Sequence, residues 1–365
     1  MNANPTVLDL TRRLIRLETI NPPGHESECA RFLGKLLEDS GFSCRIFEFA
    51  PGRSSLVAKL EGEGDRPPLC FAGHIDTVPL GARPWSYDPF AGEIADGKLY
   101  GRGSSDMKSG VAAYVVAGLS LARLSGRRAG LTIVAAAGEE TGCEGTYDLA
   151  SRRNVLGRAG ALVVAEPSSN YPMLGHKGAL WLCGKTTGVT AHGSMPEQGV
   201  NAIYAAARAV TRLEGYGFNV APDPLLGSPT LNVGTFSAGM NINSVPDEAS
   251  FTLDVCTIPG QDHACERDNL SRYLGDGVTL EALVDVAAIS SASEDPWVQE
   301  VFEVMGQILG EQPKPRTLPF FTDGSALKPA LGGPPTVILG PGETAMAHRT
   351  DEYCFVHRLE EAVAA

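Results

Sequence analysis

Apolar residues recur at helical spacing near the start of the chain. Between residues 7 and 17, and again between residues 29 and 37, they stand three or four positions apart, which gathers them on one face of an α-helix. The segment NPPGHE lies between the two stretches, and its prolines are expected to end the first helix before a second helix begins. The pattern predicts two amphipathic helices.

Several short apolar runs that follow have the length and the bounding residues of β-strands. They read SCRIFEFA, SSLVAKLEG, PLCFAGHID, LTIVAAAGEE and ALVVAEPS along the chain. A longer apolar stretch, residues 110–124, lies between the third and the fourth run and is rich in alanine, valine and leucine, which predicts a buried helix. Because strands alternate with helices, we predict a domain of the α/β class.

The pattern changes near Lys177. From there the segments read as strand, helix, strand, strand, helix and strand, over about a hundred residues, which is an ordinary domain size. After Ser291 an apolar helix, PWVQEVFEVMGQIL, and a strand, PTVILG, indicate a return to the first domain. We therefore predict a discontinuous domain of residues 1–176 and 289–365, and an inserted α+β domain of residues 177–288.

The bulk properties narrow the kind of protein. A length of 365 residues exceeds the size at which one hydrophobic core usually keeps growing, which agrees with two domains. A formal net charge of -13 argues against nucleic acid or an anionic membrane as a partner, because such partners need a basic surface.

The sequence also bears on the location of the protein. The opening residues carry charges at Asp9, Arg12 and Arg13 in place of an uninterrupted apolar run, so a signal peptide is not expected. No window of the sequence approaches the ~18 consecutive apolar residues of a membrane span. The eight cysteines are scattered without CxxC pairs, which is typical of reduced thiols. We expect a cytoplasmic protein.

Polar residues follow the apolar runs at the ends where a sheet binds its ligands. In an open α/β sheet, ligands collect outside the carboxyl ends of the strands. Acidic residues and histidines stand there or just before the long apolar helix: His74, Asp76, Asp106, Glu139, Glu140, Glu166 and His348. Taken singly each has a structural explanation, since Asp106 can cap a helix and the Glu139–Glu140 pair can be a solvated turn.

Taken together, these residues indicate a metal centre. Two histidines and several carboxylates form a nitrogen and oxygen ligand set that suits zinc and is large enough for two ions. Asp76 follows His74 by two positions on a strand, so it faces the same side and can accept the spare imidazole N–H. The adjacent carboxylates at Glu139 and Glu140 allow one to bind metal while the other takes a proton from water.

Five ordered strings carry a family likeness. GHIDTVP, GRGSSDMKSG, AAAGEETG, AEPS and AHRTDEY resemble motifs of the acetylornithine deacetylase, succinyl-diaminopimelate desuccinylase and glutamate carboxypeptidase family of di-zinc amidohydrolases. A single short motif matches by chance, but five in order across almost the whole chain are specific. The resemblance implies a zinc-exopeptidase-like catalytic domain with a mixed sheet flanked by helices, and an insert that serves as lid and dimerisation domain.

The resemblance also implies a role for each matching residue at the metals. The implied ligands are His74 and Glu166 for one metal ion, Glu140 and His348 for the other, and Asp106 between the two. Glu139 is implied as the general base. The metals would be two divalent ions, with zinc favoured and cobalt or manganese as alternatives, because affinity follows both ligand type and availability.

Further residues are implied to contact the substrate. In the insert, His192 of AHGSMPE matches a histidine that stabilises the oxyanion, and Asn243 of NINSVP matches an asparagine that contacts substrate. The segment FFTDGSALKP resembles a substrate loop, so the pocket is expected to be lined by Thr322, Asp323, Gly324 and Ser325. A lid that also dimerises implies a homodimer.

The implied reaction is hydrolysis of the amide bond of a small N-acyl amino acid. A metallo-carboxypeptidase or dipeptidase is an alternative, because the same apparatus breaks either amide. A non-catalytic metal-binding scaffold is a more distant alternative, since a fold alone does not fix function. Against it, Glu139 and all five implied ligands are present.

One position departs from the family pattern. The family usually has arginine two residues after the aspartate of a D-x-R-x-x-P strand, where it grips the substrate carboxylate. Here Cys256 follows Asp254 at that place, and cysteine cannot supply a bidentate cationic fork. We expect either another cation, such as Lys177, Arg316 or Arg349, or a substrate without a free carboxylate at that point.

Overall fold

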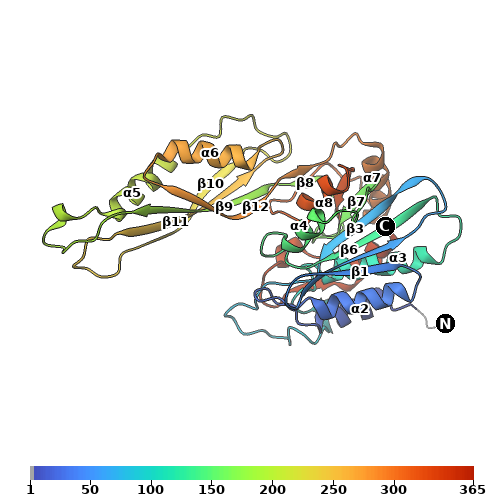
Figure 1. The fold of residues 1–365 in the computed structure, drawn as a ribbon. Helices are drawn as coiled ribbons and strands as arrows, with labels where there is room; N and C mark the ends of the chain where they lie inside the picture. The colour runs from blue at the N-terminus through green and yellow to red at the C-terminus, as the bar shows by residue number, and fades with distance from the viewer. Residues whose placement is uncertain (1–3) are drawn as a thin grey trace. The chain divides into compact units, whose positions relative to one another are not determined.

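A computed structural model of the protein describes residues 4–365 (Figure 1). Residues 1–3 of the predicted first domain lie outside the described part. The chain divides into two compact units. Apart from those three residues, the first unit comprises the chain up to Gly175, Ser290–Leu318 and Thr322–Ala365, and the second comprises His176–Ile289 and Pro319–Phe321.

The segment Pro319–Phe321 is one difference from the predicted boundaries, which assigned it to the first domain. It groups with the second unit, in which the ring of Phe321 packs edge-on against that of Trp181 at a centroid distance of 6.2 Å. The periodicity of apolar residues cannot predict such an aromatic contact, because the two residues are distant in sequence.

A mixed sheet forms the centre of the first unit, as predicted. Within the described residues it has six strands in the order β1-β2-β6-β3-β7-β14. The strands are β1 (Ser43–Ala50), β2 (Arg53–Leu60), β3 (Arg66–His74), β6 (Ala129–Ala136), β7 (Ala161–Val164) and β14 (Thr336–Ile338). The last four are parallel to one another, whereas β1 and β2 are antiparallel to their neighbours.

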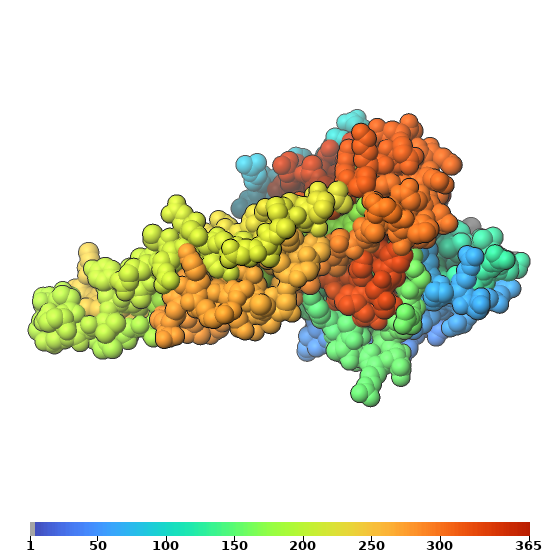
Figure 2. Space-filling view, turned by 90° about the horizontal axis from the view of Figure 1, so that it is seen from above, coloured from blue at the N-terminus to red at the C-terminus, as the bar shows by residue number. Residues whose placement is uncertain are grey.

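Helices cover this sheet and share its apolar core. They are α1 (Val7–Ile15), α2 (Ser27–Glu38), α3 (Lys108–Ala122), α4 (Glu144–Ser151), α7 (Pro296–Leu309), α8 (Gly324–Ala330) and α9 (Val356–Ala364). The helices α1, α2, α3 and α9 contribute to one core cluster with the sheet, and α3 is buried almost all round, as its uninterrupted apolar sequence predicts. In the space-filling view, segments from both ends of the chain lie side by side in this unit (Figure 2).

Helix starts differ in how their free N–H groups are satisfied. Side chains accept hydrogen bonds at the starts of α1, α7 and two helices of the second unit, α5 (Ala202–Leu213) and α6 (His263–Leu274). The accepting residues are Thr6, Asp295, Asn201 and Asp262 respectively. The long helix α3 begins after Met107, which provides no such bond. Its N-terminal groups therefore need another acceptor.

A small three-stranded sheet was not predicted. It has the order β15-β5-β4, with β4 (Glu93–Ala95), β5 (Lys98–Tyr100) and β15 (Tyr353–Phe355). These strands are too short for an alternating pattern to stand out from the flanking loops. Because β15 pairs with β5, this sheet connects the segment that follows β5 with the C-terminal part of the chain.

The second unit is an antiparallel sheet with helices on its apolar core, in the predicted order of elements. The sheet runs β10-β11-β9-β12, with β9 (Gly178–Thr187), β10 (Thr230–Ala238), β11 (Glu248–Thr257) and β12 (Thr279–Val286). Helices α5 (Ala202–Leu213) and α6 (His263–Leu274) pack on it. The remaining short elements are β8 (Gly175–His176), β13 (Ile289–Ser290), η1 (Pro196–Gln198) and η2 (Thr344–Met346).

Along residues 4–365 no helix combines the length and the apolar composition needed to cross a bilayer.

Candidate metal centre

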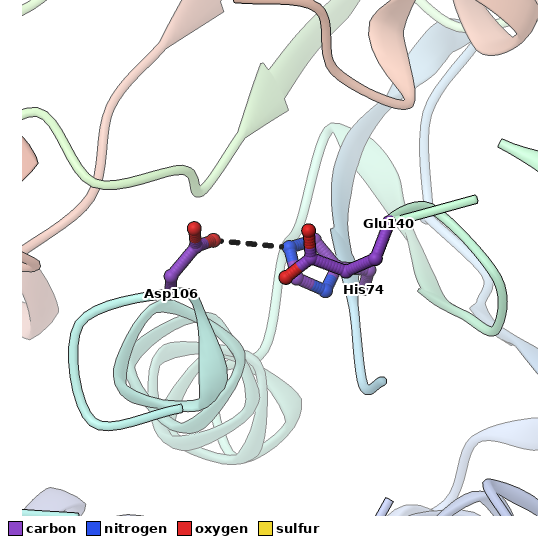
Figure 3. Close-up of side chains that lie close together, drawn as sticks. All are labelled: His74, Asp106 and Glu140. Carbon is purple, nitrogen blue, oxygen red and sulfur yellow. Dashed lines mark hydrogen bonds and ion pairs between the residues drawn. The ribbon is translucent and has the colours of Figure 1, made fainter. Parts of the chain in front are cut away.

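The first unit brings the predicted ligand residues to one edge of its sheet. His74 ends β3, Glu139 and Glu140 lie in the loop after β6, and Glu166 follows β7. Because β3, β6 and β7 are parallel neighbours, their carboxyl ends lie together. Asp106 reaches the same place from the segment before α3 (Figure 3).

His74 lies at the centre of this group and is almost fully buried. Its Nδ1 is 3.0 Å from the backbone carbonyl oxygen of Asp76. A carbonyl can only accept, so Nδ1 carries a proton, and Nε2 is the ring nitrogen that faces the carboxylates. That Nε2 is 3.2 Å from Asp106, 3.8 Å from Glu166 and 4.0 Å from Glu139, measured to the nearer carboxylate oxygens.

His348 approaches from a loop before β15. Its Nε2 lies 3.0 Å from Oε2 of Glu140 and 3.4 Å from Oδ2 of Asp106. The other oxygen of Asp106, Oδ1, is the one that faces His74. A single carboxylate therefore presents one oxygen to each of the two histidines.

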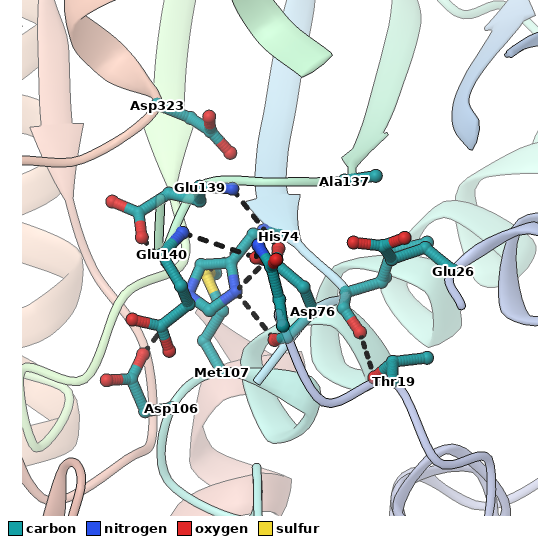
Figure 4. A network of polar contacts seen from close by, with 12 residues as sticks. Thr19, Glu26, His74, Asp76, Asp106, Met107, Ala137, Glu139, Glu140 and Asp323 are labelled. Carbon is teal, nitrogen blue, oxygen red and sulfur yellow. Dashed lines mark hydrogen bonds and ion pairs between the residues drawn. The ribbon is translucent and has the colours of Figure 1, made fainter. Parts of the chain in front are cut away.

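Asp76 contacts more of the site than the prediction assigned to it. Its carboxylate lies 3.6 Å from His74 Nδ1, farther than its own carbonyl oxygen. The carboxylate instead accepts the backbone N–H groups of Glu139 and Glu140, both at 3.2 Å (Figure 4). It also accepts the side-chain amide of Asn21 at 2.9 Å. Asp76 thus fixes the loop that carries the two glutamates, and Asn21 is a contact that the sequence reading missed.

The three glutamates of the site are held in an environment that opposes their ionisation. Asp106 differs, because hydrogen bonds with His348 and His74 outweigh the effect of burial and lower its pKa. Burial, and then the negative charge of Glu166, raise the pKa of Glu139 well above its ordinary value. Burial and the charge of Asp106 raise the pKa of Glu140 to about 7. Hydrogen bonds with Asp106 and Glu140 raise the pKa of His348 to about 10. The site therefore gathers more negative charge than its two imidazoles offset.

The donor set fits a pair of divalent cations. Among the described residues, two groups have ligand atoms that all lie within 4.8 Å of one another: His74, Asp106 and Glu140, and His74, Glu139 and Glu166. In the described part of the chain, the buried Oε1 atoms of Glu140 and Glu166 have no hydrogen-bond partner. Buried oxygens without a partner are costly unless a cation or water meets them, so the residues present suit metal ions with nitrogen and oxygen ligands.

The residues of the predicted substrate loop that were expected to line a pocket are buried, like most of the candidate ligands. Thr322 and Asp323 are fully buried, and Gly324 and Ser325 begin α8. The Asp323 carboxylate accepts the hydroxyl of Thr146 at 2.6 Å, and burial raises its pKa to about 6. These contacts tie the loop to α4, which follows the loop of Glu139 and Glu140.

His192 and Asn243 lie together in the second unit. His192 forms a β-bridge with Ser244, and the N–H of Gly193 donates to the carbonyl of Asn243 at 2.7 Å. Both side chains are exposed. The His192 ring also lies 2.8 Å from the hydroxyl of Ser194.

Comparison with known proteins agrees with the family resemblance. A family model described as "Peptidase family M20/M25/M40" matches residues 70–365 of this chain. A probable succinyl-diaminopimelate desuccinylase of Staphylococcus epidermidis is 29% identical over 93% of this chain and 91% of its own length. An acetylornithine deacetylase of Proteus mirabilis is 30% identical over 96% of this chain and 92% of its own length.

Solved structures share the fold. An M20 family metallo-carboxypeptidase of Sulfolobus solfataricus superposes with a TM-score of 0.81 at 17% identity, over 99% of this chain and 97% of that one. A Bacillus subtilis protein described as a dinuclear metal-binding peptidase gives a TM-score of 0.71 at 15% identity, over 98% and 94%. The chain therefore belongs to peptidase family M20/M25/M40, and it is a metallohydrolase.

Proposed function

We propose that this enzyme hydrolyses the amide bond of small N-acyl amino acids at a pair of divalent cations, with zinc favoured. The observation that carries the proposal is the position of Asp106, whose two oxygens face His74 and His348 at 3.2 and 3.4 Å. A carboxylate shared in this way is suited to bridging two cations. The description of the Bacillus subtilis structural neighbour as dinuclear supports the same number of ions.

The proposed ligand assignment is the one that the family resemblance implies, and the distances are compatible with it. His74 and Glu166 would hold one cation, Glu140 and His348 would hold the other, and Asp106 would be shared between them. The chemistry supplied by a bound cation pair is polarisation of the scissile carbonyl and acidification of the attacking water.

Glu139 is proposed as the proton shuttle. Its carboxylate is buried at the same sheet edge, and the bond from its backbone N–H to Asp76 fixes its loop. Glu139 takes the proton from the attacking water and returns it to the leaving amine. His192 is proposed to donate a hydrogen bond to the oxyanion that forms on the former carbonyl.

The substrate class is supported by the names of the relatives. Both sequence relatives are named for removing an acyl group from an amino acid derivative, a succinyl group in one and an acetyl group in the other. The Sulfolobus structure supports the alternative of a carboxypeptidase. A panel of N-acetyl, N-succinyl and N-formyl amino acids beside dipeptides, assayed with the zinc-loaded enzyme, separates the two. A higher kcat/KM for dipeptides than for every acyl amino acid would contradict deacylation.

We also propose that the protein is a homodimer formed through the second unit. Strand β10 is an edge strand, pairing only with β11 among the described residues. The large apolar side chains of Met240 and Ile242, in the loop after β10, are 86% and 103% exposed. An unpaired edge beside exposed apolar side chains is a surface that a second copy can cover.

A complementation experiment is expected to show that His192 acts at the active site of the other subunit. Neither His192→Ala nor Glu139→Gln protein should be active alone. Co-refolded heterodimers carrying one of each should recover a clear fraction of wild-type activity, because one of their two sites has both an intact base and an intact histidine. Heterodimers verified by mass that stay inactive would contradict action across the interface.

Because Cys256 stands where the family usually has an arginine, we expect the enzyme to bind the substrate carboxylate weakly. The residue is half-buried on β11 opposite Thr230 of β10, and burial raises the pKa of its thiol. Lys177, the candidate cation whose charge acts on the Cys256 thiol, donates to the carbonyl of Ser228 at 2.7 Å. A charge-assisted grip is worth ~1.5–3 kcal/mol, or about ten- to a hundred-fold in affinity. Cys256→Arg should therefore improve KM for N-acetylornithine by about that factor.

The carboxamide analogue of the substrate provides the control. The wild-type enzyme should prefer the free acid by less than ~100-fold in kcat/KM, and the variant should widen that preference. A wild-type preference above ~100-fold would show that another group already binds the carboxylate. Cys256→Ala, which changes the volume without adding charge, should leave the preference unchanged.

A further inference from the structure

Glu352 is a fully buried carboxylate whose partners all lie in one segment, residues 102–106. Its Oε1 accepts the backbone N–H groups of Ser105 at 2.7 Å and Asp106 at 2.9 Å. Its Oε2 accepts the N–H of Gly103 at 3.1 Å and Nη1 of Arg102 at 2.6 Å. One side chain thus holds the backbone from which Asp106 projects.

The acceptor serves the turn that precedes α3. This turn passes through Gly101 and Gly103, which have φ angles of 153° and 83°. The first N–H of α3 itself, that of Lys108, donates to the carbonyl of Gly103 at 2.9 Å, so Glu352 does not cap the helix. Buried backbone N–H groups outside a helix or strand need another acceptor, and Glu352 supplies it from a part of the chain remote in sequence.

Glu352 also belongs to the segment that carries His348. Directly after it, β15 pairs with β5, with Tyr353 opposite Tyr100. The N–H of Gly101 donates to the Glu352 carbonyl at 3.0 Å, and the hydroxyl of Ser105 donates to the carbonyl of Tyr353 at 2.7 Å. The loop of Asp106 and the loop of His348 are therefore joined through this residue.

The charge of Glu352 is balanced by Arg102. That guanidinium is 1% exposed, stacks over the ring of Trp85 at 5.2 Å and donates through Nη2 to the carbonyl of Pro79 at 3.0 Å. Among the described residues the buried Nε of Arg102 has no hydrogen-bond partner, so Glu352 and the carbonyl of Pro79 are the acceptors of this guanidinium. Loss of one partner of a buried ion pair leaves an isolated charge.

We propose that Glu352 is a positioning residue for the cation pair, which sets the distance between Asp106 and His348 without touching a cation itself. This inference rests on the proposed function, because it requires that Asp106 and His348 bind cations. Residues that orient metal ligands through hydrogen bonds typically change metal affinity by about 10- to 100-fold when they are replaced.

The test is cation binding by three forms of the full-length protein. Zinc affinity and stoichiometry are measured by calorimetry in competition with a chelator, and the visible absorption spectrum of the Co2+-loaded protein reports ligand geometry. Glu352→Gln should bind zinc about 10- to 100-fold more weakly and alter the Co2+ spectrum. Asp351→Asn is the matched control, because the adjacent Asp351 carboxylate accepts only the N–H and hydroxyl of Ser86 among the described residues. It should bind like the wild type.

Two further variants guard against a simple loss of folding. Arg102→Met combined with Glu352→Gln removes both charges of the buried pair, and Glu352→Asp keeps the charge but shortens the reach to the amides. Thermal unfolding of the metal-free protein shows which of the variants fold. Weakened zinc binding in the variants that do fold supports the positioning role. Wild-type affinity and an unchanged Co2+ spectrum in any folded Glu352 variant overturn it. Failure of the wild type itself to bind two cations would instead contradict the proposed function.

Discussion

Replacement of Glu139 by glutamine is expected to lower kcat by about 10²- to 10⁴-fold while the protein keeps its fold and its cations. The amide has nearly the same shape as the carboxylate but cannot accept the proton of the attacking water. The backbone N–H of residue 139 still donates to Asp76, so the loop should stay in place. Steady-state kinetics on the best acyl amino acid, with metal analysis of the same sample, measures both parts of the prediction.

The neighbouring glutamate provides the comparison. Glu140 lies 3.0 Å from His348 and is the proposed cation ligand of the pair, so Glu140→Gln should mainly weaken cation binding. Its activity should recover in part when excess zinc is added, whereas that of Glu139→Gln should not. The reverse pattern would show that the roles of the two residues are exchanged.

Removal of the cations is expected to abolish hydrolysis. The described residues offer no alternative nucleophile at the site, because burial raises the pKa of the Cys143 thiol well above its ordinary value. Other buried thiols are similar: burial raises the pKa of Cys29 to about 11 and that of Cys70 to about 12. Dialysis against a chelator should therefore leave less than about one per cent of the activity, a loss within the range attributed to activated water.

Reconstitution completes that measurement. Activity should return with added Zn2+, Co2+ or Mn2+, and should rise until two equivalents per chain are bound. Full activity in protein with less than one cation per chain would contradict the two-cation mechanism. The double variant Glu140→Gln/Glu166→Gln, which lacks one proposed ligand of each cation, should remain inactive under the same conditions.

The gathering of the candidate ligand residues could be predicted because their positions follow from strand ends. His74, Glu139 and Glu166 each come directly after an apolar run, and parallel neighbours bring such residues together regardless of the loops between them. The position of Asp106 could be predicted for a similar reason, because it stands just before a long apolar helix. The discontinuous organisation was visible in the change of pattern near Lys177.

The supporting contacts could not be predicted in this way. Glu352 was part of a string used for the family resemblance, yet its bonds to backbone N–H groups leave no trace in side-chain type or spacing. The contact of Asn21 with Asp76 joins residues from separate elements. Asp323 was expected to line a pocket because its segment resembles a substrate loop, and its hydrogen bond with Thr146 is a further contact that the sequence does not reveal. Each case depends on tertiary contacts between segments that a local pattern treats separately.

The origin of the ligands in distant segments has a consequence for the synthesis of the protein. Translation releases His74, Asp106, Glu139, Glu140 and Glu166 well before His348 and Glu352, and domains generally begin to fold while the chain is still growing. During that interval the nascent sheet carries its carboxylates without the second imidazole and without the side chain that fixes the Asp106 segment. With the proposed ligands, we therefore expect the full complement of cations to be acquired in the final stage of biogenesis, when the C-terminal segment docks and β15 pairs with β5.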